Sequence, residues 1–383
     1  MKNCSIEEYN RKEDKAILVL PNRIIEAFHP IIFQQLGWPF LIRHERELFR
    51  YVEGMHEERF DEFSEFLDNR LTIREFDMLQ RLTGLMCDFT ESRFHEMDFA
   101  RSSVLASLNV FRHIGYLSGN QPLRVFEFGP GSGYLGAMLI LEGYPYASTD
   151  ITQALYLYQN HSWNFFSDGK VTEGVTQEID PGILASIPGG SVVHVPWWEF
   201  VQLRPDEVPA FDIVTCNHAL TEMHPDSLRF CLLMSRALLK RSDSSLPAFV
   251  FEGWGYATPD DIERTCKTFQ EFGFSMIHSD WLITIFVPKV ANNSVQSPER
   301  IKAVPAIREG RLVGYQAAYE SSASPYHSQN PLSRAILSGR EGFEETGMVP
   351  MDQLKVLYTA LLGREDLDGP YERFAKLVNP QPA

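Results

Sequence analysis

The stretch "VFEFGPGSGYLG", residues 125–136, holds two overlapping glycine signatures. Gly129, Gly131 and Gly133 form a G-x-G-x-G pattern, and the last two of these form G-x-G-x-x-G with Gly136. The apolar "VFEF" before the glycines predicts a buried strand, and "YLGAMLILEG" after them predicts a helix. A glycine turn between a strand and a helix lets the backbone approach a ligand closely, and the helix N-terminus offers free N–H groups to an anion. The stretch therefore predicts a ligand-binding loop in an α/β domain.

Short apolar runs alternate with amphipathic helical patterns from about residue 119 to 290. The runs predicted as strands are "LRVFEF", "PYASTD", "SVVHVPWW", "FDIVTCN" and "PAFVFEG". This alternation predicts a mainly parallel sheet with right-handed crossovers and helices on both faces. The last two runs, "FSMIHSD" and "WLITIFVPK", are joined by a polar turn and predict an antiparallel hairpin. The expected fold is a Rossmann-like sheet of seven strands.

The regions on either side of this domain have different patterns. Phe60, Phe63 and Phe66 recur at helical spacing, and so do several apolar residues after position 100. Residues 1–118 are therefore predicted to form a helical N-terminal cap before the α/β domain of residues 119–290. Residues 291–383 are predicted as a linker and a small, partly ordered helical extension, because Ser, Pro, Asn and Gln are frequent up to about residue 340.

Composition limits the classes of partner. The 383-residue chain has 35 Lys and Arg against 51 Asp and Glu, a formal charge of −16, and an acidic surface repels phosphate backbones. The five cysteines contain no C-x-x-C pair, which is typical of reduced thiols in a cytoplasmic protein. No uninterrupted apolar stretch has the length of a membrane span. We expect a cytoplasmic protein that acts on a small molecule or a glycan rather than nucleic acid; the sequence does not indicate its oligomeric state.

The two glycine signatures suit two different ligands, a dinucleotide such as NAD and S-adenosyl-L-methionine (SAM). Glu127 precedes the first glycine by two residues, and its carboxylate would repel a pyrophosphate but suit the ammonium and sulfonium of SAM. Asp150 ends the second predicted strand, where it can accept hydrogen bonds from the ribose diol of either ligand. Glu127 and the terminal hairpin favour SAM. An NAD-dependent oxidoreductase is the less favoured alternative.

A family resemblance follows from several segments together. The segments "VFEFGPGSGYLG", "ASTDITQA", "FDIVTCNHALTEMH" and "FVFEGWG" resemble the seven-stranded class I SAM-dependent methyltransferases over about residues 119–290. The helical N-terminal region, followed by "EFGPGSGYLGA" and "YASTDITQA", is similar to the sugar O-methyltransferases of bacterial glycan and antibiotic gene clusters. The resemblance implies methyl transfer from SAM to a hydroxyl of a sugar or glycan precursor. A catalytically idle SAM-binding scaffold in glycan assembly is the alternative.

The resemblance also implies a cofactor-binding set. The glycines surround the methionine part of SAM, Glu127 lies near its amino group, and Asp150 binds the ribose hydroxyls. Ile151 lies against the adenine face. The set is Glu127, Gly129, Pro130, Gly131, Gly133, Asp150, Ile151, Trp197, Glu199 and Asn217.

The third-strand loop, "PWWEF", is assigned to the adenine. Glu199 is expected to accept a hydrogen bond from the adenine amino group, and Trp197 or Trp198 to pack on the ring. Packing of both tryptophans in the protein core is an equally open interpretation.

A hydroxyl is a weak nucleophile, so methyl transfer needs a base or a metal. The segment "NHALTEMHPD" follows the fourth strand and offers His218, Glu222, His224 and Asp226. His218 is the favoured base, because histidine accepts protons near neutrality and a histidine near this strand end is the base in some related O-methyltransferases. His224 and Glu222 complete the predicted catalytic set.

Structural and metal-binding roles for the same segment stay open. His218 can hydrogen-bond the loop, and His224 precedes a helix start at Pro225. Glu222, His224 and Asp226 have no recognised metal-binding spacing, so no residue is assigned to a metal. After the fifth strand, Glu252, Trp254 and Tyr256 are expected to line the acceptor pocket.

Overall fold

The computed structural model describes residues 3–28, 41–49, 52, 59–118, 122–240, 247–254, 257–289, 300–308, 310–320 and 347–363 of the chain. Within these ranges, no helix combines the length and the apolar character that a bilayer crossing requires.

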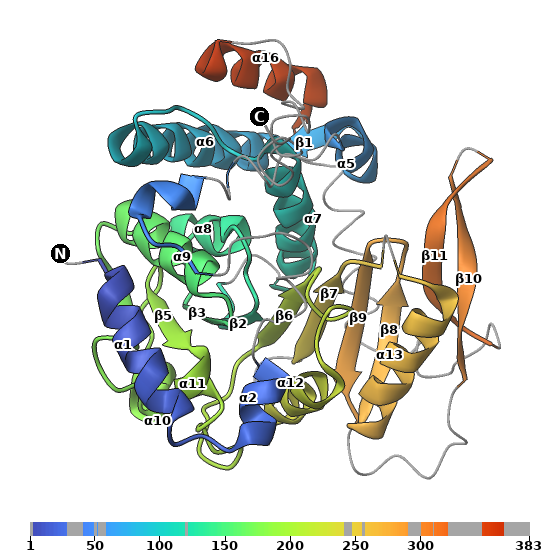
Figure 1. The fold of residues 1–383 in the computed structure, drawn as a ribbon. Coiled ribbons are helices and arrows are strands. Elements are labelled where there is room, and N and C mark those ends of the chain that lie inside the picture. Colours follow the sequence, from blue (N-terminus) through green and yellow to red (C-terminus); the bar gives the residue numbers. More distant parts are fainter. Residues whose placement is uncertain are drawn as a thin grey trace, which may run out of the picture.

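An eight-stranded sheet forms the centre of the fold, in the order β4-β5-β3-β2-β6-β7-β9-β8 (Figure 1). In this sheet β9 runs antiparallel to both of its neighbours, and the other pairs are parallel. The predicted Rossmann-like α/β class and the terminal hairpin are confirmed. The strands are β2 (Val125–Phe128), β3 (Tyr146–Asp150), β4 (Val171–Glu173), β5 (Val192–Pro196), β6 (Ile213–Asn217), β7 (Ala248–Glu252), β8 (Phe274–Ser279) and β9 (Ile283–Pro288).

The edge strand β4 is an eighth strand that the sequence analysis missed. It has 3 residues and pairs with β5. A run this short carries little periodicity, so sequence patterns do not separate it from a loop.

Strand order puts a topological switch point beside the glycine stretch. β2 pairs with β3 on one side and with β6 on the other, because the chain first adds β3, β4 and β5 on one side of β2 and then crosses to β6. In open α/β sheets, ligands bind outside the carboxyl ends of strands at such a switch point. All residues of β2 and β7 are buried, as expected for parallel strands covered on both faces.

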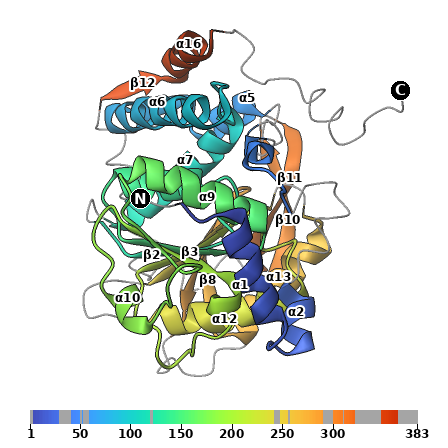
Figure 2. The same ribbon diagram turned by 60° about the vertical axis from the view of Figure 1, so that its left-hand side comes forward.

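Helices cover both faces of the sheet (Figure 2). On one face α7, α8 and α9 pack against one another, and α12 and α13 lie on the other. The helices predicted after the glycine loop, after the second and fourth strands, and before the hairpin are confirmed. The helices within this part of the chain are α8 (Tyr134–Leu141), α9 (Gln153–Phe166), α10 (Pro181–Ala185), α11 (Trp197–Phe200), α12 (Pro225–Leu238) and α13 (Pro259–Glu271).

The described part of residues 1–118 is mainly helical, as predicted. Phe60 and Phe63, two of the phenylalanines that recur at helical spacing, are buried. Val104, Leu108 and Ile114, further along the chain, are buried as well. Helix α6 lies across α7, above the sheet (Figure 1). The elements are α1 (Ile6–Ile17), α2 (Asn22–Phe28), the 3-10 helix η1 (Glu45–Leu48), α5 (Phe60–Phe66), the short strand β1 (Arg70–Thr72), α6 (Ile73–Phe94) and α7 (Arg101–Ser118).

The C-terminal part of the chain contributes elements to two places. β12 (Met348–Pro350) pairs with β1, and the predicted helix α16 (Met351–Leu362) packs on α6. Strands β10 (Ile301–Arg308) and β11 (Arg311–Tyr319) form a hairpin that contacts α13. The sequence analysis included these residues in the predicted linker and partly ordered extension, because Ser, Pro, Asn and Gln are frequent there, and it did not predict this hairpin. The predicted domain boundaries stay predictions.

One buried ion pair joins the elements of the N-terminal region. The Arg112 guanidinium on α7 donates to both carboxylate oxygens of Glu75 on α6, at 2.8 and 2.9 Å. It also donates to the carbonyls of Leu67 and Arg70, which follow α5 and begin β1. Both charged side chains are buried. This single guanidinium therefore connects four elements of the cap.

We expect Arg112→Met to destabilise the protein by about 3–5 kcal/mol, because it leaves the Glu75 carboxylate buried without its counter-ion. Urea unfolding followed by circular dichroism measures the effect. The matched control is Arg204→Met, which removes an exposed guanidinium paired with Asp206 and should cost less than about 1 kcal/mol. Equal losses in the two variants would contradict the assigned role of Arg112.

Candidate functional site

The glycine loop turns sharply between β2 and α8. Gly129, Gly131 and Gly133 have φ angles of 60, 58 and 75°, in the left-handed region that favours glycine. A Cβ atom on Gly131 would meet no protein atom within 4 Å, whereas one on Gly133 would lie 3.0 Å from Trp163. Gly131 therefore faces open space at the start of α8, and Gly133 is needed for packing. Pro130, between them, is half-buried, and its carbonyl accepts from Gly133 N at 2.9 Å.

Glu127 lies on β2, between the neighbouring strands β3 and β6. Its side chain is only 1% exposed. The carboxylate accepts hydrogen bonds from Tyr146 Oη on β3 at 2.6 Å and from Asn217 Nδ2 on β6 at 3.0 Å. Burial raises the pKa of Glu127 from its ordinary 4.5 to about 7, although both hydrogen bonds work against this shift. Two predicted site residues, Glu127 and Asn217, are thus in direct contact.

Asp150 is tied to the glycine loop through helix α9. One carboxylate oxygen accepts from Thr152 N at 2.9 Å, and the other accepts from Gln159 Nε2 at 2.8 Å. The same Gln159 amide donates to the carbonyl of Gly131 at 2.7 Å. Burial raises the pKa of Asp150, and these hydrogen bonds oppose the rise. Asp150 and the loop therefore form one hydrogen-bonded unit, with half-buried Ile151 next in sequence.

The loop after the third predicted strand, which is β5, forms the helical turn α11, and helix α1 packs on it. Trp197 Nε1 donates to Glu13 Oε1 at 2.7 Å, and the Trp198 ring packs edge-on against Tyr9 at 4.8 Å between centroids. Both tryptophans are buried; Glu199 is half-buried, and burial raises its pKa. The position of α1 was not predictable from the sequence, because an amphipathic helix pattern does not identify the surface on which the helix packs.

The ends of β6 and β7 bring together His218 and Glu252. His218 Nε2 lies 3.1 Å from Glu252 Oε2, and the backbone N of His218 donates to the Glu252 carbonyl at 2.8 Å. His218 has a φ of 60°, and a Cβ on Gly253 would come within 2.9 Å of its Cα, so this close approach requires Gly253. The His218 side chain is 47% exposed, whereas Glu252 is 1% exposed. The sequence analysis named both residues but did not pair them.

The two carboxylate oxygens of Glu252 differ in their contacts. Oε2 contacts His218, while Oε1 is buried with no hydrogen-bond partner among the described residues. Buried acceptors are normally hydrogen-bonded, and the described residues supply no donor to this oxygen.

The other predicted residues after β6 are arranged differently. His224 is the N-cap of α12, and its Nδ1 accepts from Asp226 N at 3.2 Å. Asp226 accepts two hydrogen bonds from Arg23 of α2, and Glu222 is exposed. Trp254 is buried and donates to Thr284 Oγ1 at 2.5 Å; Tyr256 lies outside the described residues. His218 is therefore the histidine of this segment that contacts a buried carboxylate.

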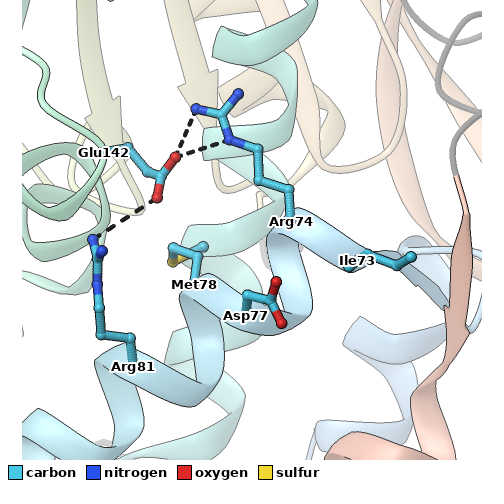
Figure 3. Close-up of a pocket in the computed structure, with 6 residues that line it drawn as sticks. All are labelled: Ile73, Arg74, Asp77, Met78, Arg81 and Glu142. Atoms are coloured by element: carbon cyan, nitrogen blue, oxygen red, sulfur yellow. Dashed lines mark hydrogen bonds and ion pairs between the residues drawn. The ribbon is translucent and has the colours of Figure 1, made fainter.

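A separate hollow lies at the opposite end of α8 from the glycine loop, between α8 and α6 (Figure 3). Glu142 accepts from Arg74 at 2.6 Å and lies 3.9 Å from an Arg81 nitrogen, so one carboxylate already pairs with both guanidinium groups. None of the predicted site residues lines this hollow. Its lining is Ile73, Arg74, Asp77, Met78, Arg81 and Glu142.

Comparisons with known proteins give a likeness of fold. No family model and no curated protein matches the chain. A magnesium protoporphyrin IX methyltransferase from Synechocystis PCC 6803, solved with bound S-adenosylhomocysteine (SAH), is 13% identical, with 57% of this chain and 96% of that chain covered and a TM-score of 0.33. The 1,6-didemethyltoxoflavin-N1-methyltransferase from Burkholderia thailandensis, solved with bound 1,6-didemethyltoxoflavin and SAH, is 16% identical, with 57% of this chain and 91% of that chain covered and a TM-score of 0.32. The N-methyltransferase NodS from Bradyrhizobium japonicum, solved with SAH, is 9% identical, with 47% and 86% covered and a TM-score of 0.31.

Glu127→Gln should stabilise the ligand-free protein at neutral pH. Because the folded-state pKa is about 7 and the ordinary value is 4.5, the contribution of Glu127 to folding is fully present below pH 4.5. It is lost as the pH rises through about 7. The loss amounts to at most about 3 kcal/mol, at roughly 1.4 kcal/mol per pKa unit.

Urea unfolding of both proteins from about pH 4.5 to about 8 tests this expectation. The stability of the Gln variant relative to the parent should increase over that range. A constant difference would show that Glu127 is already ionised in the folded protein throughout.

Proposed function

We propose that the protein is a SAM-dependent methyltransferase that methylates a hydroxyl of a sugar or glycan precursor. The observation that carries the cofactor assignment is the arrangement at the switch point. There the open side of Gly131, the buried Glu127 carboxylate and the Asp150–Gln159 unit all lie at the carboxyl ends of β2 and β3.

The residues at the switch point fit SAM chemically. Space beside Gly131 permits close approach of a ligand carboxylate to the start of α8. A ligand ammonium near Glu127 would favour the ionised carboxylate, whose burial otherwise disfavours charge. Asp150 would hold the ribose hydroxyls, and Ile151, Trp197 and Glu199 the adenine. Bound there, SAM supplies a methyl group made electrophilic by the sulfonium.

On the acceptor side, His218 is the proposed general base. Because a carboxylate oxygen accepts from Nε2, the neutral imidazole carries its proton on Nε2 and offers the Nδ1 lone pair to the acceptor hydroxyl. Glu252 would stabilise the imidazolium that forms. The second oxygen of Glu252, buried and without a partner among the described residues, is suited to accept from a neighbouring hydroxyl. A polyhydroxylated acceptor such as a sugar meets both requirements, and this supports the acceptor class that the sequence resemblance implies.

Experiments can separate the proposed methyltransferase from two alternative functions, an NAD-dependent oxidoreductase and an idle SAM-binding scaffold. A thermal-shift screen with SAM, SAH and NAD separates a methyltransferase or SAM-binding scaffold from an NAD-dependent oxidoreductase. Transfer of labelled methyl from SAM to a panel of sugars, nucleotide sugars and phenols separates a methyltransferase from an idle scaffold. Stabilisation by NAD, without stabilisation by SAM or SAH, would refute the proposal.

Gly131→Val should abolish SAM binding and leave the protein folded, because the branched side chain would fill the space where the ligand approaches. Calorimetric titration with SAH measures binding, and circular dichroism measures folding. Gly143→Val is the matched control, because Gly143 also has a left-handed φ of 80° and open space at Cβ, but lies past the far end of α8. Retained binding in the Gly131 variant would place the cofactor elsewhere.

His218→Ala should lower the methyl-transfer rate about 10²–10⁴-fold and leave SAM affinity nearly unchanged. In the parent enzyme the rate should rise with pH as the imidazole loses its proton, and the variant should lose this dependence. His224→Ala, which alters the N-cap of α12, is the control and should retain most of the activity. If His224→Ala proves to be the inactive variant, the base assignment is wrong.

A further inference from the structure

Three potential metal ligands meet between α7 and the β8–β9 hairpin. His113 lies on α7, His278 lies on β8, and Asp280 lies in the turn that follows β8. One ligand atom from each residue lies within 4.8 Å of the other two. His278 Nε2 is 3.3 Å from Asp280 Oδ2, and the two imidazole centroids are 5.8 Å apart.

The surrounding hydrogen bonds orient two of these ligands. His113 Nδ1 lies 2.8 Å from the Asn109 carbonyl, which can only accept, so the ring proton is on Nδ1 and the Nε2 lone pair is available to an ion. Asp280 Oδ1 accepts from Leu282 N at 2.9 Å and from Ile283 N at 2.6 Å, and Oδ2 faces His278. Metal-bound histidines and carboxylates usually have such outer partners, which fix the tautomer and the ring orientation.

A β-bulge also shapes the cluster. The register between β8 and β9 shifts between Met276 and His278, so the regular alternation of side chains is broken directly before the histidine. Bulges commonly redirect a side chain near a functional site. Here the shifted segment carries His278 beside the turn that holds Asp280.

The three groups differ in their exposure to solvent. His113 is 4% exposed, while the side chains of His278 and Asp280 are 17% and 37% exposed, which leaves one side of the cluster open to solvent.

We propose that His113, His278 and Asp280 form a binding site for a divalent transition metal of the zinc type. Two imidazoles and a carboxylate are ligands that Zn²⁺ accepts, whereas Ca²⁺ and Mg²⁺ prefer oxygen ligands only. Zn–N and Zn–O bonds of about 2.0–2.1 Å put ligand atoms about 3.4 Å apart in a tetrahedral site, a separation that side-chain rotation reaches from the spacing seen here. Three protein ligands leave a fourth position for water or another oxygen.

The site lies at the same edge of the sheet as the His218–Glu252 pair. Glu252 is opposite Ile283 in the β7–β9 ladder, and Gly253 N donates to the Leu282 carbonyl at 3.2 Å. Leu282 N in turn donates to Asp280. The metal proposal rests on the positions of its three ligand residues, so it does not depend on the proposed methyltransferase function.

The sequence analysis considered another possible metal-binding cluster, made of Glu222, His224 and Asp226. This cluster is less suited to an ion. Asp226 is bound by the Arg23 guanidinium, and His224 Nδ1 accepts from the backbone of α12. These contacts use both carboxylate oxygens of Asp226 and one of the two ring nitrogens of His224. The two clusters can be separated experimentally, because each contains a different histidine.

Metal content and metal titration test the proposal. The full-length protein, stripped with chelator, is titrated with Zn²⁺ by calorimetry, and bound zinc is counted by mass spectrometry after dialysis. We expect one Zn²⁺ per chain, a higher melting temperature with Zn²⁺, and visible absorption bands when Co²⁺ replaces it. Asp280→Asn is the main variant, because the amide oxygen can still accept from Leu282 N and Ile283 N and so preserve the turn.

Asp280→Asn and His278→Gln should each weaken Zn²⁺ binding by more than about 100-fold, beyond the loss usual for an outer partner. His224→Ala should bind as the parent does. An absence of Zn²⁺ binding by the parent protein would overturn the proposal. So would unchanged affinity in the Asp280 and His278 variants, or loss of the site in His224→Ala alone.

Discussion

The hydrogen bonds that converge on the Glu127 carboxylate fix the ends of three adjacent strands. The β2–β6 ladder ends with Glu127 opposite Thr215, so beyond that point side-chain hydrogen bonds connect the two strands. Tyr146 from β3 and Asn217 from β6 both donate to this one carboxylate. A buried carboxylate is costly unless it is protonated or faces a cation. Three strand ends therefore meet at a group whose charge a cationic ligand would stabilise, and strongly perturbed acids often mark functional sites.

The sequence identified the central sheet and the glycine turn because both leave local signals. Apolar runs of four to six residues, separated by helical patterns, can be recognised in a sequence without knowing which segments lie beside them in the fold. The left-handed angles of Gly129 and Gly131 follow from the same logic, since a tight turn between a strand and a helix needs residues without a side chain. The order of these elements was enough to predict a sheet with an antiparallel last strand.

Contacts between distant residues were not predictable in this way. His218 and Glu252 were each identified as strand-end residues, but their pairing depends on β6 and β7 being neighbours with a glycine at the crossing point. His113 and Asp280 are far apart in sequence and lie on a helix and a turn that no local pattern joins. Likewise, the packing of α1 on Trp197 depends on complementary surfaces rather than on either segment alone. The sequence thus indicated the proposed cofactor residues more fully than the contacts of the proposed acceptor residues.

Glu252 connects the proposed base to the strand that leads to the proposed metal site. Its side chain contacts His218, while its backbone belongs to the ladder with β9, which continues into the turn that carries Asp280. A proton on His218 would be balanced by Glu252, and a cation between His113 and His278 would be balanced by Asp280. Because each positive charge has its own carboxylate, neither site has to lose its partner for the other to be occupied. The proposed base and the proposed metal site therefore lie at the same end of the sheet, each with its own counter-charge.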